Sequence, residues 1–188
     1  IERLHGKVIG QTLSDIEHVY RNQAFLDFSS WSTKCRDIDR VDGIDAILNE
    51  VNTVKASFVV ITGGEPTMHS LLSLVNLLHD QGIEVAIETA GVYHLDAPID
   101  WYCFSPKKFK QPVAEAYQKA NELKVVIFHP SDLAWAEDHA KRVSENCLLY
   151  LQPEWSKQER FLPQIITYVK DNPKWSLSLQ THKFMNIP

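Results

Sequence analysis

A buried strand that runs into a glycine turn, at residues 58–69, constrains the fold of this chain more than any other stretch. Phe58 to Ile61 is an unbroken run of aromatic and β-branched residues, which predicts a buried strand. Gly63 and Gly64 follow and free the backbone from steric limits, and Glu65-Pro66 comes next. This order places a carboxylate and bare backbone at the carboxyl end of a strand, where α/β folds bind their ligands. The alternative is an ordinary strand-to-helix turn with a solvated glutamate.

The remainder of the chain alternates between predicted strands and predicted helices. Apolar runs predict strands at residues 58–61, 84–88, 101–105, 123–128, 148–151 and 175–179. Periodicity and composition predict helices at residues 41–51, 70–81, 111–121, 131–146 and 156–171. Residues 11–32 have no clean period and predict a loop or a short helix. Short connections between alternating elements predict one α/β domain, residues 1–188, built on a largely parallel sheet.

The ends of the predicted strands carry polar and conformationally special residues. They read Gly-Gly-Glu-Pro at 63–66, Glu-Thr-Ala-Gly at 88–91, Ser-Pro-Lys at 105–107, Gln-Pro at 152–153 and Gln-Thr-His-Lys at 180–183. In a barrel-like α/β fold the carboxyl ends of the strands converge on one mouth. Each of these turns alone could be structural, but all of them together predict a ligand site.

Composition argues against several classes of function. The chain of 188 residues has a formal net charge of −5, which argues against a broad electrostatic surface for nucleic acid. No apolar run reaches the roughly 18 residues of a membrane span, so no membrane partner is predicted. Cys35, Cys103 and Cys147 are odd in number and widely spaced, which predicts neither disulfides nor a metal site and suits a reducing cytoplasm. Because the first residue is Ile1, the N-terminus is expected to be incomplete.

Several of these pieces, in order, resemble the 7-carboxy-7-deazaguanine synthase family of radical S-adenosylmethionine proteins, which acts in queuosine biosynthesis. The resemblance covers nearly the whole chain and rests on Arg3-Leu4-His5-Gly6, Ile61 to Pro66, Glu88 to Gly91, Ser105-Pro106-Lys107, Leu151-Gln152-Pro153, and Leu179 to Lys183 with Ile187-Pro188. It implies a partial (β/α) barrel, a homodimer in the cytoplasm and a lyase reaction on a pterin. It also implies S-adenosylmethionine, a 4Fe–4S cluster and Mg²⁺ as cofactors.

The same resemblance implies site residues. Gly63, Gly64 and Glu65 would meet the amino-acid end of S-adenosylmethionine, with Glu65 pairing with its ammonium. Ser105 would contact the ribose, and Gln152-Pro153 would lie near the same cofactor. The pterin-like substrate carries a carboxylate and a guanidine-like edge, which suit basic side chains and carboxylates respectively. Its implied partners are Arg3, Glu88, Thr89, Gln180, His182, Lys183 and the terminal carboxylate of Pro188.

The chain departs from the family at the iron–sulfur motif. The family holds its cluster through Cys-x3-Cys-x2-Cys, just after the segment that matches Arg3 to Gly6. Those three positions are Lys7, Gln11 and Ser14 in this chain, and an ammonium, an amide and a hydroxyl cannot replace thiolates. The family's magnesium-binding threonine is also replaced, since Asp15 is followed by isoleucine. These residues therefore support neither the cluster nor Mg²⁺.

Three hypotheses about function remain open. The first is a cluster-less homologue that keeps the barrel and its pocket and has a ligand-binding, regulatory or partner role. The second is an active synthase, converting 6-carboxytetrahydropterin to 7-carboxy-7-deazaguanine, whose functional N-terminal segment differs from the printed one. The third is an unrelated phosphate-binding barrel, in which ligand binding does not depend on Glu65. The chemistry of positions 7, 11 and 14 favours the first hypothesis.

Overall fold

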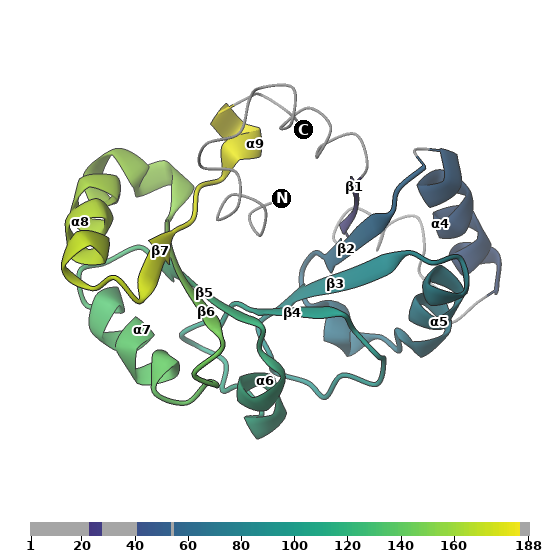
Figure 1. The fold of residues 1–188 in the computed structure, drawn as a ribbon, viewed down its shortest axis with the longest axis horizontal. Helices are drawn as coiled ribbons and strands as arrows, with labels where there is room; N and C mark the ends of the chain where they lie inside the picture. The colour runs from purple at the N-terminus through teal and green to yellow at the C-terminus, as the bar shows by residue number, and fades with distance from the viewer. Residues whose placement is uncertain (1–22, 28–40, 54, 185–188) are drawn as a thin grey trace.

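Parallel strands, joined side by side in the order of the sequence, form the sheet. The computed structural model describes residues 23–27, 41–53 and 55–184. Within these ranges the strands are β1 (Gln23–Asp27), β2 (Phe58–Thr62), β3 (Glu84–Thr89), β4 (Trp101–Phe104), β5 (Glu122–Ile127), β6 (Leu148–Pro153) and β7 (Trp175–Leu177). Each pairs in parallel with the next, and β1 and β7 are the edges of the described sheet, which curves into an open arc (Figure 1). The predicted partial (β/α) barrel is confirmed.

Helices cover the outside of this arc. They are α4 (Val41–Thr53), α5 (Leu72–Asp80), α6 (Ala114–Lys119), α7 (Asp132–Ala140) and α8 (Gln158–Asp171). The short α9 (Thr181–Phe184) lies at the open side of the arc (Figure 1). The 3-10 turns η1 (Pro66–Met68) and η2 (Trp155–Lys157) follow β2 and β6. Among the described residues, no helix combines the length and the apolar composition required to cross a lipid bilayer.

The apolar core lies between the sheet and the helices that cover it. Successive side chains of a strand point to opposite faces, so every second residue can face the helices. Most of those positions are apolar in β2, β3, β4, β5 and β6, and they include Val59, Ile61, Val85, Ile87, Phe104, Leu123, Val125 and Leu151. They share one buried cluster with helix residues such as Leu74, Leu78, Ala136, Phe161 and Ile165. Burying one such side chain contributes about 1.5–3 kcal/mol, so this layer stabilises the fold.

The predicted alternation of strands and helices is confirmed over residues 41–177, with shifts of a few residues at the ends of most elements. The prediction of a loop or short helix is wrong for residues 23–27, which form β1. This strand pairs with β2 from Gln23 opposite Phe58 to Asp27 opposite Thr62. Pairing with a neighbouring strand is a tertiary contact, and it can override a weak local pattern.

The helix predicted over residues 131–146 is shorter than expected, because α7 ends at Ala140. Beyond it the backbone bonds shorten their span, with Arg142 N donating to His139 O at 3.0 Å. The Ser144 hydroxyl accepts the N–H of Asn146 at 3.3 Å, and Cys147 N donates to Ser144 O at 2.9 Å. Beyond Ala140 these short-span bonds replace the helical pattern, in which each N–H donates to the carbonyl four residues earlier.

The seam between β4 and β5 is short. Two residue pairs are in register there, Cys103 with Glu122 and Phe104 with Leu123, whereas six pairs join β5 to β6. Side chains add to the seam: Trp101 Nε1 donates to Glu122 Oε2 at 3.0 Å, and the backbone N–H of Tyr102 donates to Asn121 Oδ1 at 2.7 Å. The relative position of these strands therefore depends on side-chain bonds as well as on the ladder.

Candidate functional site

The polar strand ends predicted from the sequence lie along one edge of the sheet, which we call the carboxyl edge. Every described strand pair is parallel, so the carboxyl ends of all strands meet at this edge. Gly63 follows β2, Glu88 is the second-last residue of β3, and Ser105 follows β4. Gln152 is near the end of β6, and Gln180 precedes α9. Residues from several strands thus meet along one rim, as in the ligand sites of (β/α) barrels.

Glu65 holds the ends of β2 and β3 together. Its side chain is buried, and its Oε1 accepts hydrogen bonds from Thr67 Oγ1 at 2.6 Å and from Thr89 Oγ1. Its Oε2 accepts the backbone N–H of Ala90 at 2.9 Å. Both carboxylate oxygens therefore have protein donors, and the Thr89 hydroxyl donates its hydrogen bond to Glu65. Contacts of Glu65 with a ligand ammonium, and of Thr89 with a substrate, stay predictions.

The glycines at the carboxyl edge are of two kinds. Gly91 has φ +68°, and a Cβ there would lie 2.5 Å from Ala116 Cβ and 2.9 Å from Phe104 Cε2, so packing and backbone both require glycine. Gly63 has φ +119°, which also favours glycine. Gly64 is different, because it is exposed and a Cβ there would meet nothing within 4 Å. Packing does not explain Gly64, and its bare backbone leaves room for a ligand to approach.

The face of the sheet turned away from the helices carries charged and polar side chains, and we call it the inner face. Its described members include Glu88 on β3, Cys103 on β4, Glu122 and Lys124 on β5, and Gln152 on β6; register places Glu88 beside Cys103 and Cys103 beside Glu122. In closed barrels this position is filled by packed, mostly apolar side chains. A polar inner face on an open sheet indicates a binding surface instead.

An ion pair crosses the inner face from β5 to β3. Lys124 Nζ lies 2.8 Å from Glu88 Oε2. The lysine side chain is 6% exposed and the glutamate side chain 34%, so part of the glutamate side chain is open to solvent. Burial raises the pKa of Glu88, but the Lys124 and Lys107 ammonium groups lower it by more than burial raises it. The pKa therefore lies below its ordinary value. Glu88 is therefore an ionised hydrogen-bond acceptor at neutral pH.

The residues after β6 and β7 form the other end of the carboxyl edge. Gln152 is buried, and its Oε1 accepts a hydrogen bond from Ser178 Oγ at 3.2 Å. In α9, Lys183 Nζ lies 5.2 Å from the centre of the Trp155 ring, and the Phe184 ring meets the same tryptophan edge-on at 5.2 Å. These contacts hold Lys183 against η2.

The two described cysteines carry protonated thiols at neutral pH. Burial, together with the Glu122 carboxylate, raises the pKa of Cys103 well above its ordinary value. Burial also raises the pKa of Cys147, to about 12. Cluster ligation needs thiolates. Within the described ranges, no group of three His, Cys, Asp or Glu side chains could hold a metal ion.

Several predicted site residues lie outside the described ranges, and their roles stay predictions: Arg3, Lys7, Gln11, Ser14 and Pro188. The backbone of His182 belongs to α9, but its side chain is also outside the description.

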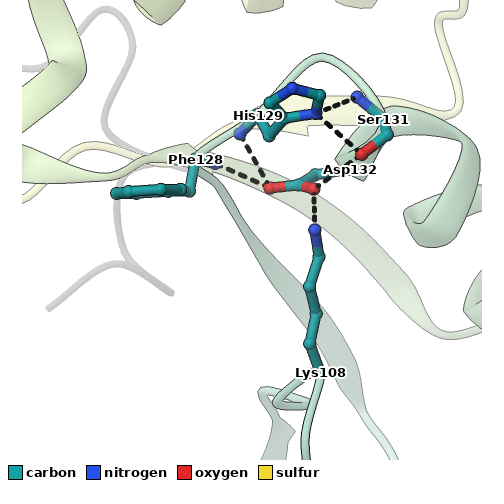
Figure 2. Close-up of polar contacts among 5 residues, drawn as sticks. All are labelled: Lys108, Phe128, His129, Ser131 and Asp132. Carbon is teal, nitrogen blue, oxygen red and sulfur yellow. Dashed lines mark hydrogen bonds and ion pairs between the residues drawn. The ribbon is translucent and has the colours of Figure 1, made fainter.

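Sequence reasoning missed two charged positions of the site. Lys124 interrupts the apolar run of β5, and its alternation with Leu123 and Val125 is the signal that could have placed it on the inner face. The sequence predicts Asp132 only as the start of a helix, whereas its carboxylate binds Lys108 in the loop after β4 (Figure 2).

Comparison with known proteins finds synthases among the relatives of this chain. It is 45% identical, over 159 residues, to the 7-carboxy-7-deazaguanine synthase of Flavobacterium psychrophilum, which covers 85% of this chain and 74% of the relative. It is 44% identical, over 144 residues, to the protein of the same name from Synechocystis, covering 77% and 69%. The structure is similar to the crystal structure of QueE from Escherichia coli, with a TM-score of 0.63 and 29% identity, over 74% of this chain and 63% of that one. No family model matches the chain.

Proposed function

Since the chain belongs to the 7-carboxy-7-deazaguanine synthase family, we propose that it keeps the family's ligand-binding barrel without the iron–sulfur centre that the radical reaction requires. Its role is to bind S-adenosylmethionine and a pterin or 7-deazapurine, as a homodimer with a regulatory or partner function. The observation that carries the proposal is the Glu88–Lys124 ion pair on the inner face.

The pair suits the guanidine-like edge of a pterin. That edge presents neighbouring N–H donors, and an ionised carboxylate accepts them in charge-assisted hydrogen bonds. Lys124 keeps Glu88 ionised and fixes one of its oxygens at 2.8 Å. An ion pair with one partner buried, as Lys124 is here, is weak support for stability, since apolar residues of similar volume stabilise as well or better. Ligand binding therefore explains the pair better than folding does.

The carboxyl edge offers groups that fit S-adenosylmethionine. Gly63 and Gly64 would admit its amino-acid end, and Ser105, whose hydroxyl accepts a hydrogen bond from Lys107 Nζ at 3.3 Å, would contact the ribose. Gln152-Pro153 would lie beside the nucleoside. When bound, this cofactor supplies an activated sulfonium; the residues named bind and orient it. Glu65 supports this site indirectly, because its hydrogen bonds hold the glycine turn against β3.

The residues present do not fit a 4Fe–4S cluster. Lys7, Gln11 and Ser14 stand at the three ligand positions that the family resemblance implies, and none of them is a thiolate. Cys103 and Cys147 are buried thiols with raised pKa values. No step of radical chemistry is therefore assigned to this chain.

Two measurements test the proposal. The protein is purified without oxygen, incubated with iron and sulfide, and examined for the broad cluster absorption near ~400 nm. Calorimetry then measures binding of S-adenosylmethionine and of 6-carboxytetrahydropterin. We expect no cluster and binding of both ligands, with the pterin weakened in Glu88→Gln. A stable cluster, or no heat with either ligand, would overturn the proposal.

A second candidate, the active synthase, is favoured by the 45% identity to a protein of that name. It predicts a stable cluster after reconstitution and formation of 7-carboxy-7-deazaguanine from 6-carboxytetrahydropterin. The phosphate-binding alternative predicts binding of inorganic phosphate that Glu65→Ala leaves unchanged. The same protein preparation therefore separates all three functions.

A further inference from the structure

One ion pair joins two neighbouring loops of the carboxyl edge. Lys108 belongs to the loop after β4, and Asp132 is the first residue of α7, directly after the turn that follows β5. The Lys108 ammonium binds Asp132 Oδ1, as Figure 2 shows. We call this contact the clasp.

The turn after β5 is built around the Asp132 carboxylate. The side chain is 1% exposed, and its Oδ2 accepts the backbone N–H groups of Phe128 at 2.8 Å and His129 at 2.9 Å (Figure 2). Burial raises the pKa of Asp132, but the Lys108 ammonium and the two N–H donors lower it by more than burial raises it. The pKa is therefore below its ordinary value, and the carboxylate is charged at neutral pH. Such a group is held rigidly, because each bond to it replaces water that burial has removed.

The loop after β4 is anchored to β3 by Ser105 N, which donates to Thr89 O at 2.8 Å, and to Gly91 O by Val113 N at 2.8 Å. It leaves the sheet at the short seam, where β4 and β5 share two residue pairs in register. It carries Ser105 and Lys107, whose side chains are hydrogen-bonded to each other at 3.3 Å. Lys108 is the next residue, so the clasp is the described side-chain bond that ties this loop to the turn after β5. The clasp therefore adds a link between the loop after β4 and the end of β5, beyond the bonds of the β4–β5 seam.

We infer that Lys108 and Asp132 are positioning residues for the nucleoside of S-adenosylmethionine. The clasp ties the loop that carries Ser105 to the end of β5, and a nucleoside bound along the carboxyl edge would lie across both. This inference rests on the proposed function, because Ser105 is its implied ribose contact. A preorganised loop saves the cost of ordering it when the ligand binds.

Matched lysine variants test the inference. Lys108→Met removes the clasp and leaves Asp132 with its two backbone donors, while Lys110→Met changes an exposed lysine of the same loop whose side chain has no ion pair among the described residues. Calorimetry with S-adenosylmethionine and with 6-carboxytetrahydropterin is run on both variants and the unaltered chain. We expect Lys108→Met to weaken S-adenosylmethionine about tenfold and the pterin less than about twofold, with Lys110→Met unchanged. Lys108→Arg, which can bind the same carboxylate, should recover most of the affinity.

Each other outcome is decisive. Equal affinity of the unaltered chain and Lys108→Met for S-adenosylmethionine would overturn the clasp's role and leave the proposed function standing. An equal loss for both ligands, together with a lower melting temperature, would mean that the clasp only stabilises the fold. Failure of the unaltered chain to bind either ligand would overturn the proposed function and the inference together.

Discussion

The two faces of the sheet are made from alternate residues of the same strands, yet they differ in chemistry. On the helix-covered face, Ile87, Phe104 and Leu123 are completely buried among apolar neighbours. On the inner face, the residues next to them in sequence are Glu88, Cys103, and the two charged residues Glu122 and Lys124 on either side of Leu123. A shift of one residue along a strand therefore separates the packing layer from the polar layer.

The contrast teaches which face carries stability and which carries binding. Apolar burial is the main favourable term in folding, and the outer layer supplies it. Charged pairs away from bulk water add little or no net stability, so their presence on the inner face needs another reason. The part of the Glu88 side chain that is open to solvent supplies one, which is the proposed binding of a ligand. Substitutions on each face test this division.

Adjacent residues on opposite faces of β4 should differ most in their effect on stability. Phe104 is buried in the core with the Tyr117 ring edge-on at 4.9 Å, so Phe104→Ala should lower the free energy of unfolding by about 3–5 kcal/mol. Cys103→Ala, on the inner face, should cost about 1 kcal/mol. Urea unfolding followed by circular dichroism measures both. Similar losses in the two variants would contradict the division of the faces.

The two glycines that differ in their surroundings should respond differently to alanine. Gly91→Ala would force a Cβ within 2.5 Å of Ala116 Cβ at positive φ, and should destabilise by about 2–3 kcal/mol. Gly64→Ala meets nothing within 4 Å and should leave the melting temperature nearly unchanged while weakening S-adenosylmethionine binding. Thermal unfolding and calorimetry separate the two effects. A large loss of stability in Gly64→Ala would show that its bare backbone serves the fold.

Removing the inner-face cation should affect ligand affinity. Lys124→Met frees Glu88 from its fixed position and should weaken 6-carboxytetrahydropterin about tenfold, which is about 1.4 kcal/mol. Lys119→Met is the control, because it breaks an ion pair with Glu115 on α6 in the outer layer. Calorimetry should detect no change in affinity for that variant. If Lys124→Met binds the pterin as well as the unaltered chain does, the pair serves only the sheet.

The smallest effect is expected from an outer-layer carboxylate, as a dependence on pH. Burial raises the pKa of Glu137, but bonds from Lys174, Tyr168 and Trp175 lower it further, to below the ordinary value of 4.5. Its contribution to stability is therefore complete above about pH 5 and is lost as the pH falls through the lower, folded-state pKa. The stability difference between the unaltered chain and Glu137→Gln should narrow from pH 6 to pH 3, by less than about 1.4 kcal/mol per pH unit. A difference that stays constant over this range would contradict the shift.

The sequence predicted the outer layer well because that layer repeats. Apolar positions at period two in β3 and at helical spacing in α4 and α8 identify the elements directly. The residues at the strand ends were also predictable, because glycine, proline and polar residues cluster there. Their common edge follows from parallel pairing alone.

The inner face was harder to predict, because its members are defined by partners far away in the sequence. Glu88 and Lys124 are on strands separated by β4, and nothing local indicates that they meet. Glu65 shows the reverse case. Its place beside two glycines predicts a ligand contact, while its buried bonds to Thr89 and Ala90 give it a local structural task. The hydrogen-bond partners of such a residue show whether it has a structural role, and sequence spacing does not specify those partners.

The short seam between β4 and β5 also bears on cooperativity. Strands β1 to β4 and strands β5 to β7 share one apolar core, but the sheet joins them by two residue pairs in register, by the backbone bond from Asn121 N to Tyr102 O at 3.0 Å and by side-chain bonds. Native-state hydrogen exchange should resolve these two parts of the sheet as separate opening units, with the six-pair β5–β6 ladder exchanging slowly. A ligand that touches Ser105 on one part and Gln152 on the other would bind only when both are closed. Such a ligand would stabilise the contact between the two parts of the sheet, and they would then open together.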